Sequence, residues 1–307
     1  PASTIFVALT MAQPASAQDS ATVSNAAMFH DAYALAEIAG QRATALRGEG
    51  ALLNFYFGVP VTKIISRATL ALRYRAPLVA QNELRLELLL NGTRVGATTI
   101  VGGNDVEAEI PLPTDLLTTD NTMSLRVEGQ CAACSRSSAP WIAIDSASRL
   151  ETSGTRLPLA NDLALLPIPF FDAVSQRAWQ LPVVFSQPPA LQEVNAAAIV
   201  ASWFGVFSDI RGVRFPVSVG ELPEGHALVL LRRGSMLDSA LLLPTQPRTL
   251  IAMRDNPRDP YGKLLILAGD SPADLVAAAR ALVAPDRMPA HAGVEAVRDP
   301  GVQGRWQ

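Results

Sequence analysis

Hydrophobic positions recur with a period of two through the first half of the chain. Apolar and polar side chains alternate along Thr69–Tyr74 and again along Leu84–Leu90, although Leu89 departs from the pattern. Such alternation is typical of half-buried antiparallel strands. Asn91-Gly92 follows the second run, and both residues tolerate the positive φ of a type I′ turn, so a hairpin with residues 93–100 is predicted. Further short strands are expected at 54–59, 106–110, 123–127, 142–144 and 149–152, which favours a β-sandwich of the jelly-roll type over residues 46–152.

After Gly154 the apolar positions form short continuous runs instead of alternating. Helices are expected at 190–208 and 272–284, with a weaker candidate at 234–241. Ser271 is a natural N-cap for the second helix, and Pro272 suits its first turn. Short buried strands between helices predict a parallel, flavodoxin-like α/β domain over residues 153–285, so the fold class is mixed. The expected strands are 183–185, 215–219, 227–231, 250–253 and 264–268.

The two ends of the chain differ from these domains. Ile5–Met11 is apolar, and Ala15-Ser16-Ala17 matches the cleavage site of a secretory signal, although the basic segment that normally precedes it is missing. We interpret residues 1–17 as a truncated signal peptide, which predicts export to an oxidising compartment. Residues 18–45 are expected to form a loosely held lead-in with a helix over 32–45, and residues 286–307 a linker. Beyond the signal no run approaches the ~18 apolar residues of a membrane helix.

Composition and charge exclude some classes of protein. The chain has 307 residues, of which 49% are hydrophobic and 17% charged, which suits two folded domains. Its formal net charge is −3 and it has no basic block, which argues against a nucleic-acid partner. Lys63 and Lys263 are the only lysines, and we interpret the preference for arginine as a consequence of genome composition.

Two cysteines, Cys131 and Cys134, lie in a loop rich in glycine, serine and alanine. A single Cys-x-x-Cys pair is half of a zinc site, and the three histidines have no ligand-like spacing. A local disulfide between Cys131 and Cys134 is the favoured interpretation. Free thiols and a redox-active pair remain as alternatives.

The turns after the predicted strands carry no recognisable catalytic or phosphate-binding motif. Two prolines in Ser186–Pro189 lack the N–H groups of a phosphate cradle, and Asp270 and Asp274 would repel an anion, so helix capping is favoured there. Arg232-Arg233-Gly234 is interpreted as a solvated turn. No serine has the context of a nucleophile elbow. We therefore assign no catalytic residue, cofactor site or metal ligand, and predict that the chain is not an enzyme.

Exposed aromatic rings are the remaining candidates for binding. A flat ring stacks on the face of a sugar with a large contact area and little loss of entropy. Trp141 and Tyr56 are assigned as candidate carbohydrate-binding residues, whereas Tyr74 and Phe55 are expected in the core. Trp141 follows Pro140 in a polar loop, where it is either a surface contact or a buried anchor.

Five separated segments carry a resemblance to a known family in their order and spacing. They are Leu90-Asn91-Gly92, Cys131–Ser148 with Trp141–Asp145, Asp162–Asp172 with its Pro-Phe-Phe-Asp end, Ala201–Gly205 with Arg211–Pro216, and Asn256–Leu265. Together they resemble the N-terminal half of the periplasmic B subunit of bacterial cellulose synthase, and the similarity covers about residues 46–285 of this chain.

The resemblance implies a carbohydrate-binding-like jelly roll followed by a flavodoxin-like domain in a non-catalytic accessory subunit. In the family this pair of domains is repeated and followed by a membrane anchor, so the chain is expected to be a fragment or a split product, tethered to the inner membrane only through the missing part. The implied partners are the catalytic subunit of cellulose synthase, the nascent cellulose chain and other copies of this subunit. Family members are labelled as binding cyclic di-GMP, but that nucleotide acts on the catalytic subunit, so no site for it is assigned here.

Two other functions stay open at this point. The chain is alternatively a secreted carbohydrate-active enzyme with a sandwich binding module. It is otherwise a purely structural assembly domain whose sandwich binds neighbouring copies and no sugar.

Overall fold

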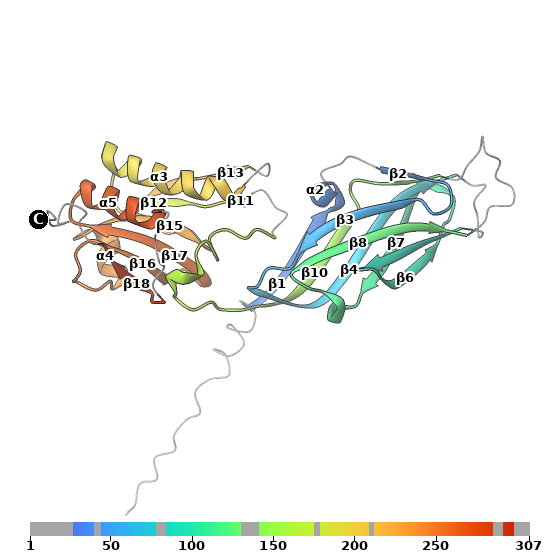
Figure 1. Ribbon diagram of the computed structural model, residues 1–307, viewed down its shortest axis with the longest axis horizontal. Coiled ribbons are helices and arrows are strands. Elements are labelled where there is room, and N and C mark those ends of the chain that lie inside the picture. The colour runs from blue at the N-terminus through green and yellow to red at the C-terminus, as the bar shows by residue number, and fades with distance from the viewer. Residues whose placement is uncertain are drawn as a thin grey trace, which may run out of the picture.

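Two lobes, each with its own hydrophobic core, make up the folded chain (Figure 1). The computed structural model describes residues 27–39, 44–77, 84–129, 141–174, 179–208, 212–284 and 291–297. The N-terminal lobe is a β-sandwich and the C-terminal lobe is a sheet covered by helices on both faces, so most of the regular structure is sheet. Cys131, Cys134, the expected signal peptide and most of the expected linker lie outside the described residues.

Two antiparallel sheets form the sandwich. The first contains, in order, β1 (Met28–Ala34), β10 (Arg149–Arg156), β4 (Lys63–Ala76), β9 (Trp141–Ile144) and β2 (Thr44–Arg47), and β7 (Gly103–Leu112) also pairs with β4. The second contains β3 (Leu52–Gly58), β8 (Asp120–Glu128), β5 (Arg85–Leu90) and β6 (Thr93–Thr99). A short 3-10 helix, η2 (Thr114–Leu116), precedes β8.

The alternating residues of the sequence form the core between these sheets. Leu70–Tyr74 and Leu86–Leu90 contribute side chains that are at most 2% exposed at every second position. The predicted hairpin is confirmed, because Asn91 and Gly92 have φ of 51° and 81° and connect β5 to β6. Tyr74 and Phe55 are buried as expected.

The N-terminal lead-in differs from the prediction. A helix was expected over residues 32–45, but Met28–Ala34 forms β1, an edge strand paired with β10, and among the described residues of that range only Leu35–Ala39 is helical (α2). Phe29 and Asp31 point inward from β1 and are 7% and 8% exposed. Pairing with β10 and burial of the Phe29 ring outweigh the helix propensity of the alanines that follow.

The sheet of the second lobe is mixed rather than all parallel. Its order is β14 (Val217–Val219), β12 (Val183–Phe185), β15 (Ala227–Arg232), β17 (Asp259–Gly269), β16 (Leu250–Asn256) and β18 (Val294–Ala296). The first four strands are parallel, whereas β16 is antiparallel to β17 and to β18. The parallel prediction is wrong for β16 because a tight turn after Asn256 returns the chain directly into β17. Strand β18 lies inside the expected linker.

Helices cover both faces of this sheet. The helices α3 (Leu191–Ser208) and α5 (Pro272–Val283) lie together on one face, and α4 (Met236–Leu241) covers the other (Figure 1). The predicted start of α5 is confirmed, because Ser271 and Asp274 form a reciprocal capping box. No described helix combines the length and the apolar character that crossing a membrane requires.

The chain passes between the lobes through residues 157–178, described except for 175–178, with a 3-10 turn at η4 (Leu163–Leu165). A two-stranded parallel ribbon of β11 (Trp179–Gln180) and β13 (Val213–Arg214) follows at the second lobe. Lys263 of β17, only 3% exposed, donates to Asn161 at 3.0 Å and pairs with Asp255. This contact fixes the start of the connection to the second lobe.

Candidate functional site

Tyr56 lies in the middle of β3 with its side chain on the outer face of the four-stranded sheet. It is 63% exposed, whereas Phe55 and Phe57 on either side are 3% and 5% exposed. The alternation of β3 explains this placement, because two inward phenylalanines force the residue between them outward. Tyr56 pairs across the strands with Thr122 of β8. Its ring is therefore available to a ligand.

Polar side chains continue from Tyr56 across the same face. Asn54 pairs with Ser124, whose hydroxyl donates to Asn54 Oδ1 at 2.7 Å. Leu52, 53% exposed, pairs with Arg126 one step further along. An amide, a hydroxyl and a guanidinium beside an exposed ring are the groups that recognise sugar hydroxyls and sugar faces.

A buried carboxylate anchors this polar face. Glu87 of β5 is 2% exposed, accepts from Arg126 Nε at 2.9 Å and pairs with Arg94 Nε at 2.6 Å. Burial acts to raise the pKa of Glu87, and the hydrogen bond and charges of the two arginines outweigh it, so the pKa lies below its ordinary value. Sequence reasoning missed Glu87, although its place between two inward-facing leucines on a predicted strand marked it as an outward-facing carboxylate.

Trp141 lies on a different surface. It is the first residue of β9, pairs with Arg47 of β2 and is 36% exposed, while Ile142 and Ile144 point into the core. Its side chain therefore faces outward from the six-stranded sheet and not from the sheet that carries Tyr56. The two candidate carbohydrate-binding residues are not brought together, and any contacts they make with a glycan are separate.

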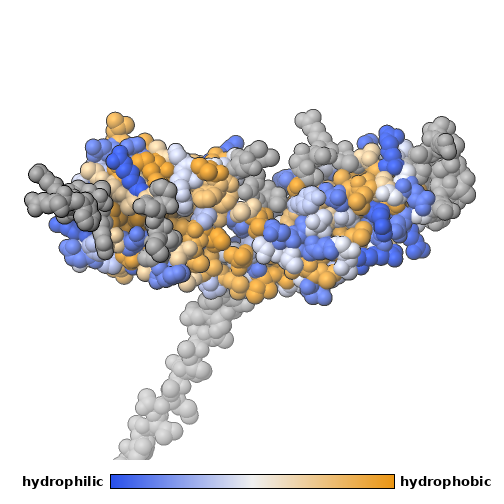
Figure 2. All heavy atoms as spheres, in the orientation of Figure 1, coloured by the Kyte–Doolittle hydropathy of each residue, from blue (hydrophilic) through white to orange (hydrophobic). Residues whose placement is uncertain are grey.

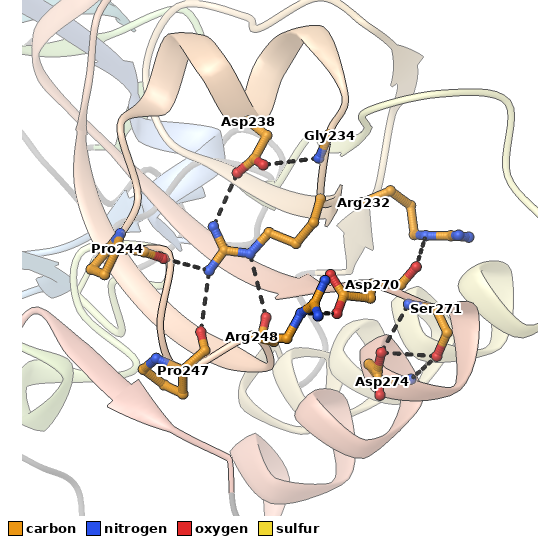
Figure 3. A network of polar contacts seen from close by, with 10 residues as sticks. Arg232, Gly234, Asp238, Pro244, Pro247, Arg248, Asp270, Ser271 and Asp274 are labelled. Carbon is orange, nitrogen blue, oxygen red and sulfur yellow. Dashed lines mark hydrogen bonds and ion pairs between the residues drawn. The ribbon is translucent and has the colours of Figure 1, made fainter.

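The carboxyl ends of β15 and β17, where doubly wound sheets commonly bind ligands, carry a closed polar network (Figure 3). Arg233 was expected in a solvated turn, but its side chain is 12% exposed. It donates to Asp238 Oδ1 at 3.1 Å and to the carbonyl oxygens of Pro244, Pro247 and Arg248 at 2.7, 3.3 and 3.3 Å. This arginine ties the loop after α4 to the helix itself, because its guanidinium donates to three carbonyls of the loop and to Asp238 of α4.

The other charges at this edge are also engaged within the protein. Asp270 pairs with Arg248, and Arg232 donates to the Asp270 carbonyl at 3.1 Å and contacts Glu193 at 3.4 Å. Asp274 accepts from the Ser271 N–H at 2.8 Å (Figure 3). The charged side chains at this edge therefore stabilise the fold, because the arginines pair with acceptors of the protein itself.

The described histidines occupy three different environments. His226 accepts from the Lys263 N–H at 3.0 Å, and burial lowers its pKa to about 4. His291 Nδ1 lies 3.4 Å from Asp162 Oδ2, and the pKa of Asp162 is lowered first by the Ala164 N–H. His30 is exposed on β1. Among the described residues no group of three His, Cys, Asp or Glu side chains is placed to hold a metal ion.

Comparisons with protein families match both lobes in order. The family described as "Cellulose synthase BcsB, first CBM domain" matches residues 30–156, and "Cellulose synthase BcsB, first FD domain" matches residues 162–295. A cyclic di-GMP-binding protein of Xanthomonas axonopodis pv. citri is 35% identical over 252 residues, which are 77% of this chain and 32% of that protein. The chain thus spans about a third of the length of this relative.

Two further likenesses are more distant. Cellulose synthase 2 of Novacetimonas hansenii is 28% identical over 266 residues, which are 85% of this chain and 16% of that protein. A solved carbohydrate-binding module CBM36 in complex with calcium and xylotriose aligns with 40% of this chain and 99% of that module at 12% identity and a TM-score of 0.26, too low to support an argument about fold or ligand.

Proposed function

The chain belongs to the cellulose synthase BcsB family, and from this premise we propose that it is a non-catalytic accessory module that holds and guides a glucan outside the inner membrane. Its partners are the catalytic subunit of cellulose synthase, the nascent cellulose chain and neighbouring copies of the same subunit. Its location is the periplasm, where a longer form of the protein is tethered to the inner membrane.

The observation that carries this proposal is the order of the two domains together with the exposed ring on the first of them. A domain matching the BcsB carbohydrate-binding module presents Tyr56, 63% exposed, beside Asn54 and Ser124 on one flat strand face. Flat strand faces with one exposed ring suit an extended polymer, because the polymer slides along them without entering a closed pocket. Trp141 supplies a second, separate contact on the opposite sheet.

A relative supports the choice of partner. The region of Cellulose synthase 2 of Novacetimonas hansenii that is similar to this chain makes up 16% of that protein. Joining of this region to a cellulose synthase in one polypeptide supports an association of the two when they are separate chains. The relative named for cyclic di-GMP binding leads to no residue assignment here, because no described residue is singled out by that name.

The finer description of each lobe is also part of the proposal. The sandwich over residues 46–152, extended by β1, is a jelly roll, and residues 153–285, extended by β18, form a variant of the flavodoxin-like fold. In this variant a single reversed strand, β16, follows β17 in the sheet, and β18, antiparallel to β16, forms the edge.

Cellulose production in a cell that depends on this protein tests the proposal. We expect Tyr56→Ala and Trp141→Ala together to reduce the cellulose output severalfold, with normal expression and normal co-purification of the catalytic subunit. The matched control is Tyr56→Phe with Trp141→Phe, which keeps an aromatic ring at both positions and should keep the output. Unchanged output in the alanine variant removes these rings from the mechanism, and release of shortened sugars from cello-oligosaccharides by the purified chain would contradict the non-catalytic role.

A further inference from the structure

We propose that the junction between the two lobes is a binding cleft for an uncharged glycan segment. The choice of a β-glucan as that glycan rests on the proposed function, whereas the cleft itself follows from the geometry of the junction. Ligand sites occur preferentially between domains, and Figure 2 shows apolar side chains on both lobes where they meet.

Three adjoining cavities follow the junction, with volumes of about 320, 440 and 260 Å³. Thr62 and Pro169 line all three. Lys63 and His226 are shared by the first two, and Asp172 by the second and third. Because neighbouring cavities share wall residues, they adjoin one another along the junction, and together they suit several linked sugar units better than one small molecule.

Half-buried aromatic rings line this cleft from both lobes. Tyr261 borders the first cavity, and Tyr33 and Trp179 border the second. Trp179 Nε1 donates to the Phe170 carbonyl at 2.7 Å, and its ring packs edge-on against Phe171 at a centroid distance of 5.0 Å. A ring held in place with part of its surface accessible loses little entropy when a sugar stacks on it.

Fixed polar groups stand beside these rings. Asp31, 8% exposed, accepts from the Tyr33 hydroxyl at 3.2 Å and pairs with Lys63. The Lys63 ammonium lies 4.8 Å from the centre of the Phe29 ring, so the cation is held from two sides. Sugar hydroxyls both donate and accept, and such preorganised charged groups bind them without rearrangement.

The charges around the cleft favour a neutral occupant over an anion. The described lining includes two basic side chains, Lys63 and Arg156, and four acidic ones. The acidic ones are Asp31, Asp172, Glu224 and Asp259. This excess of carboxylates repels phosphates, so a nucleotide such as cyclic di-GMP is disfavoured in the cleft while an uncharged glycan is not.

Calorimetric titration of the intact chain with cellohexaose tests the cleft. We expect saturable binding whose Kd is nearly the same in about 0.05 M and about 0.5 M salt, because no charge on the ligand is screened. Thr62→Trp, which fills the point shared by the three cavities, should abolish binding. Tyr261→Ala should raise the Kd at least tenfold and Tyr261→Phe only slightly. Thr93→Trp, on the exposed hairpin, is the matched control and should bind like the unmodified chain.

Each other outcome contradicts the cleft in a recognisable way. Binding that survives Thr62→Trp and Tyr261→Ala but is lost on Tyr56→Ala with Trp141→Ala overturns the cleft and leaves the proposed function intact. Absence of cellohexaose binding by a folded, unmodified chain also overturns the cleft, and the cellulose output experiment then judges the proposed function separately. Binding of cyclic di-GMP that Thr62→Trp abolishes refutes the preference for an uncharged ligand.

Discussion

Lys63 and Lys263, the two lysines of the chain, each form an ion pair within the folded protein. The sequence alone led us to attribute the scarcity of lysine to composition, yet both lysines are enclosed in ion pairs with Asp31 and Asp255. Their side chains are 23% and 4% exposed. A compact ammonium on a flexible stem suits such enclosed sites better than the broad fork of a guanidinium. The partners are 32 and 8 residues away in sequence, and only folding brings the Lys63 pair together.

His226 makes stability depend on pH at the residue scale. Burial is the largest cause of its pKa of about 4, with Asp259 acting to raise it and Lys263 and Arg156 to lower it further. An unfolded histidine titrates near pH 6.5, so between that pH and about 4 the unfolded chain binds a proton that the folded chain refuses. The contribution of His226 to the free energy of unfolding is fully present above pH 6.5. As the pH falls to about 4 and below, about 3 kcal/mol of it is lost.

Urea unfolding of the unmodified chain and of His226→Asn measures this effect. The asparagine Oδ1 keeps an acceptor for the Lys263 N–H but does not titrate. We expect the free energy of unfolding to fall more steeply between pH 6.5 and 4.5 in the unmodified chain than in His226→Asn. Parallel slopes in the two proteins would contradict a depressed pKa at this histidine.

At the scale of elements, turns and caps that depend on neighbouring residues were predicted correctly, whereas strands that depend on distant partners were not. The Asn91-Gly92 turn and the Ser271 cap depend on neighbours within a few residues, and both are present. Strands β1 and β18 depend on partners more than 40 residues away, β10 and β16, and both were assigned to other structures. The direction of β16 likewise depends on a single turn after Asn256 and not on the apolar pattern of the strand.

The loop after α4 provides an element-scale prediction. The Arg233 side chain donates to three carbonyls of that loop and to Asp238 of α4 and is 12% exposed, whereas the Arg248 side chain makes one ion pair and is 68% exposed. A lysine cannot reproduce the fork of a guanidinium. We expect Arg233→Lys to lower the free energy of unfolding by about 1–3 kcal/mol, because hydrogen bonds from a charged donor to three loop carbonyls and to Asp238 are lost.

Arg248→Lys is the matched control for this substitution and should change the free energy of unfolding by less than about 1 kcal/mol. Hydrogen exchange of residues 242–249 should accelerate in Arg233→Lys and match that of the unmodified chain in Arg248→Lys. Equal effects of the two substitutions would show that the loop does not depend on Arg233.

At the scale of the whole molecule, the sequence predicted a sandwich followed by an α/β lobe but not the junction between them. Tyr56 was named from its strand, and the structure exposes it. Thr62, Tyr33 and Tyr261 come from segments up to 228 positions apart and meet only at the junction. No local pattern marks such residues, since each of them is an ordinary half-buried side chain in its own strand or turn.

The two enclosed lysines also make the folded chain resistant to a protease that cleaves only after lysine. Trypsin has 25 basic residues to attack, whereas such a protease has only position 63 in β4 and position 263 in β17. Cleavage after either lysine requires that strand to leave its sheet, so the two cuts report separately on opening of the sandwich and of the α/β lobe. The fragment pattern over time would therefore rank the two lobes by local stability in one digestion, without any introduced label.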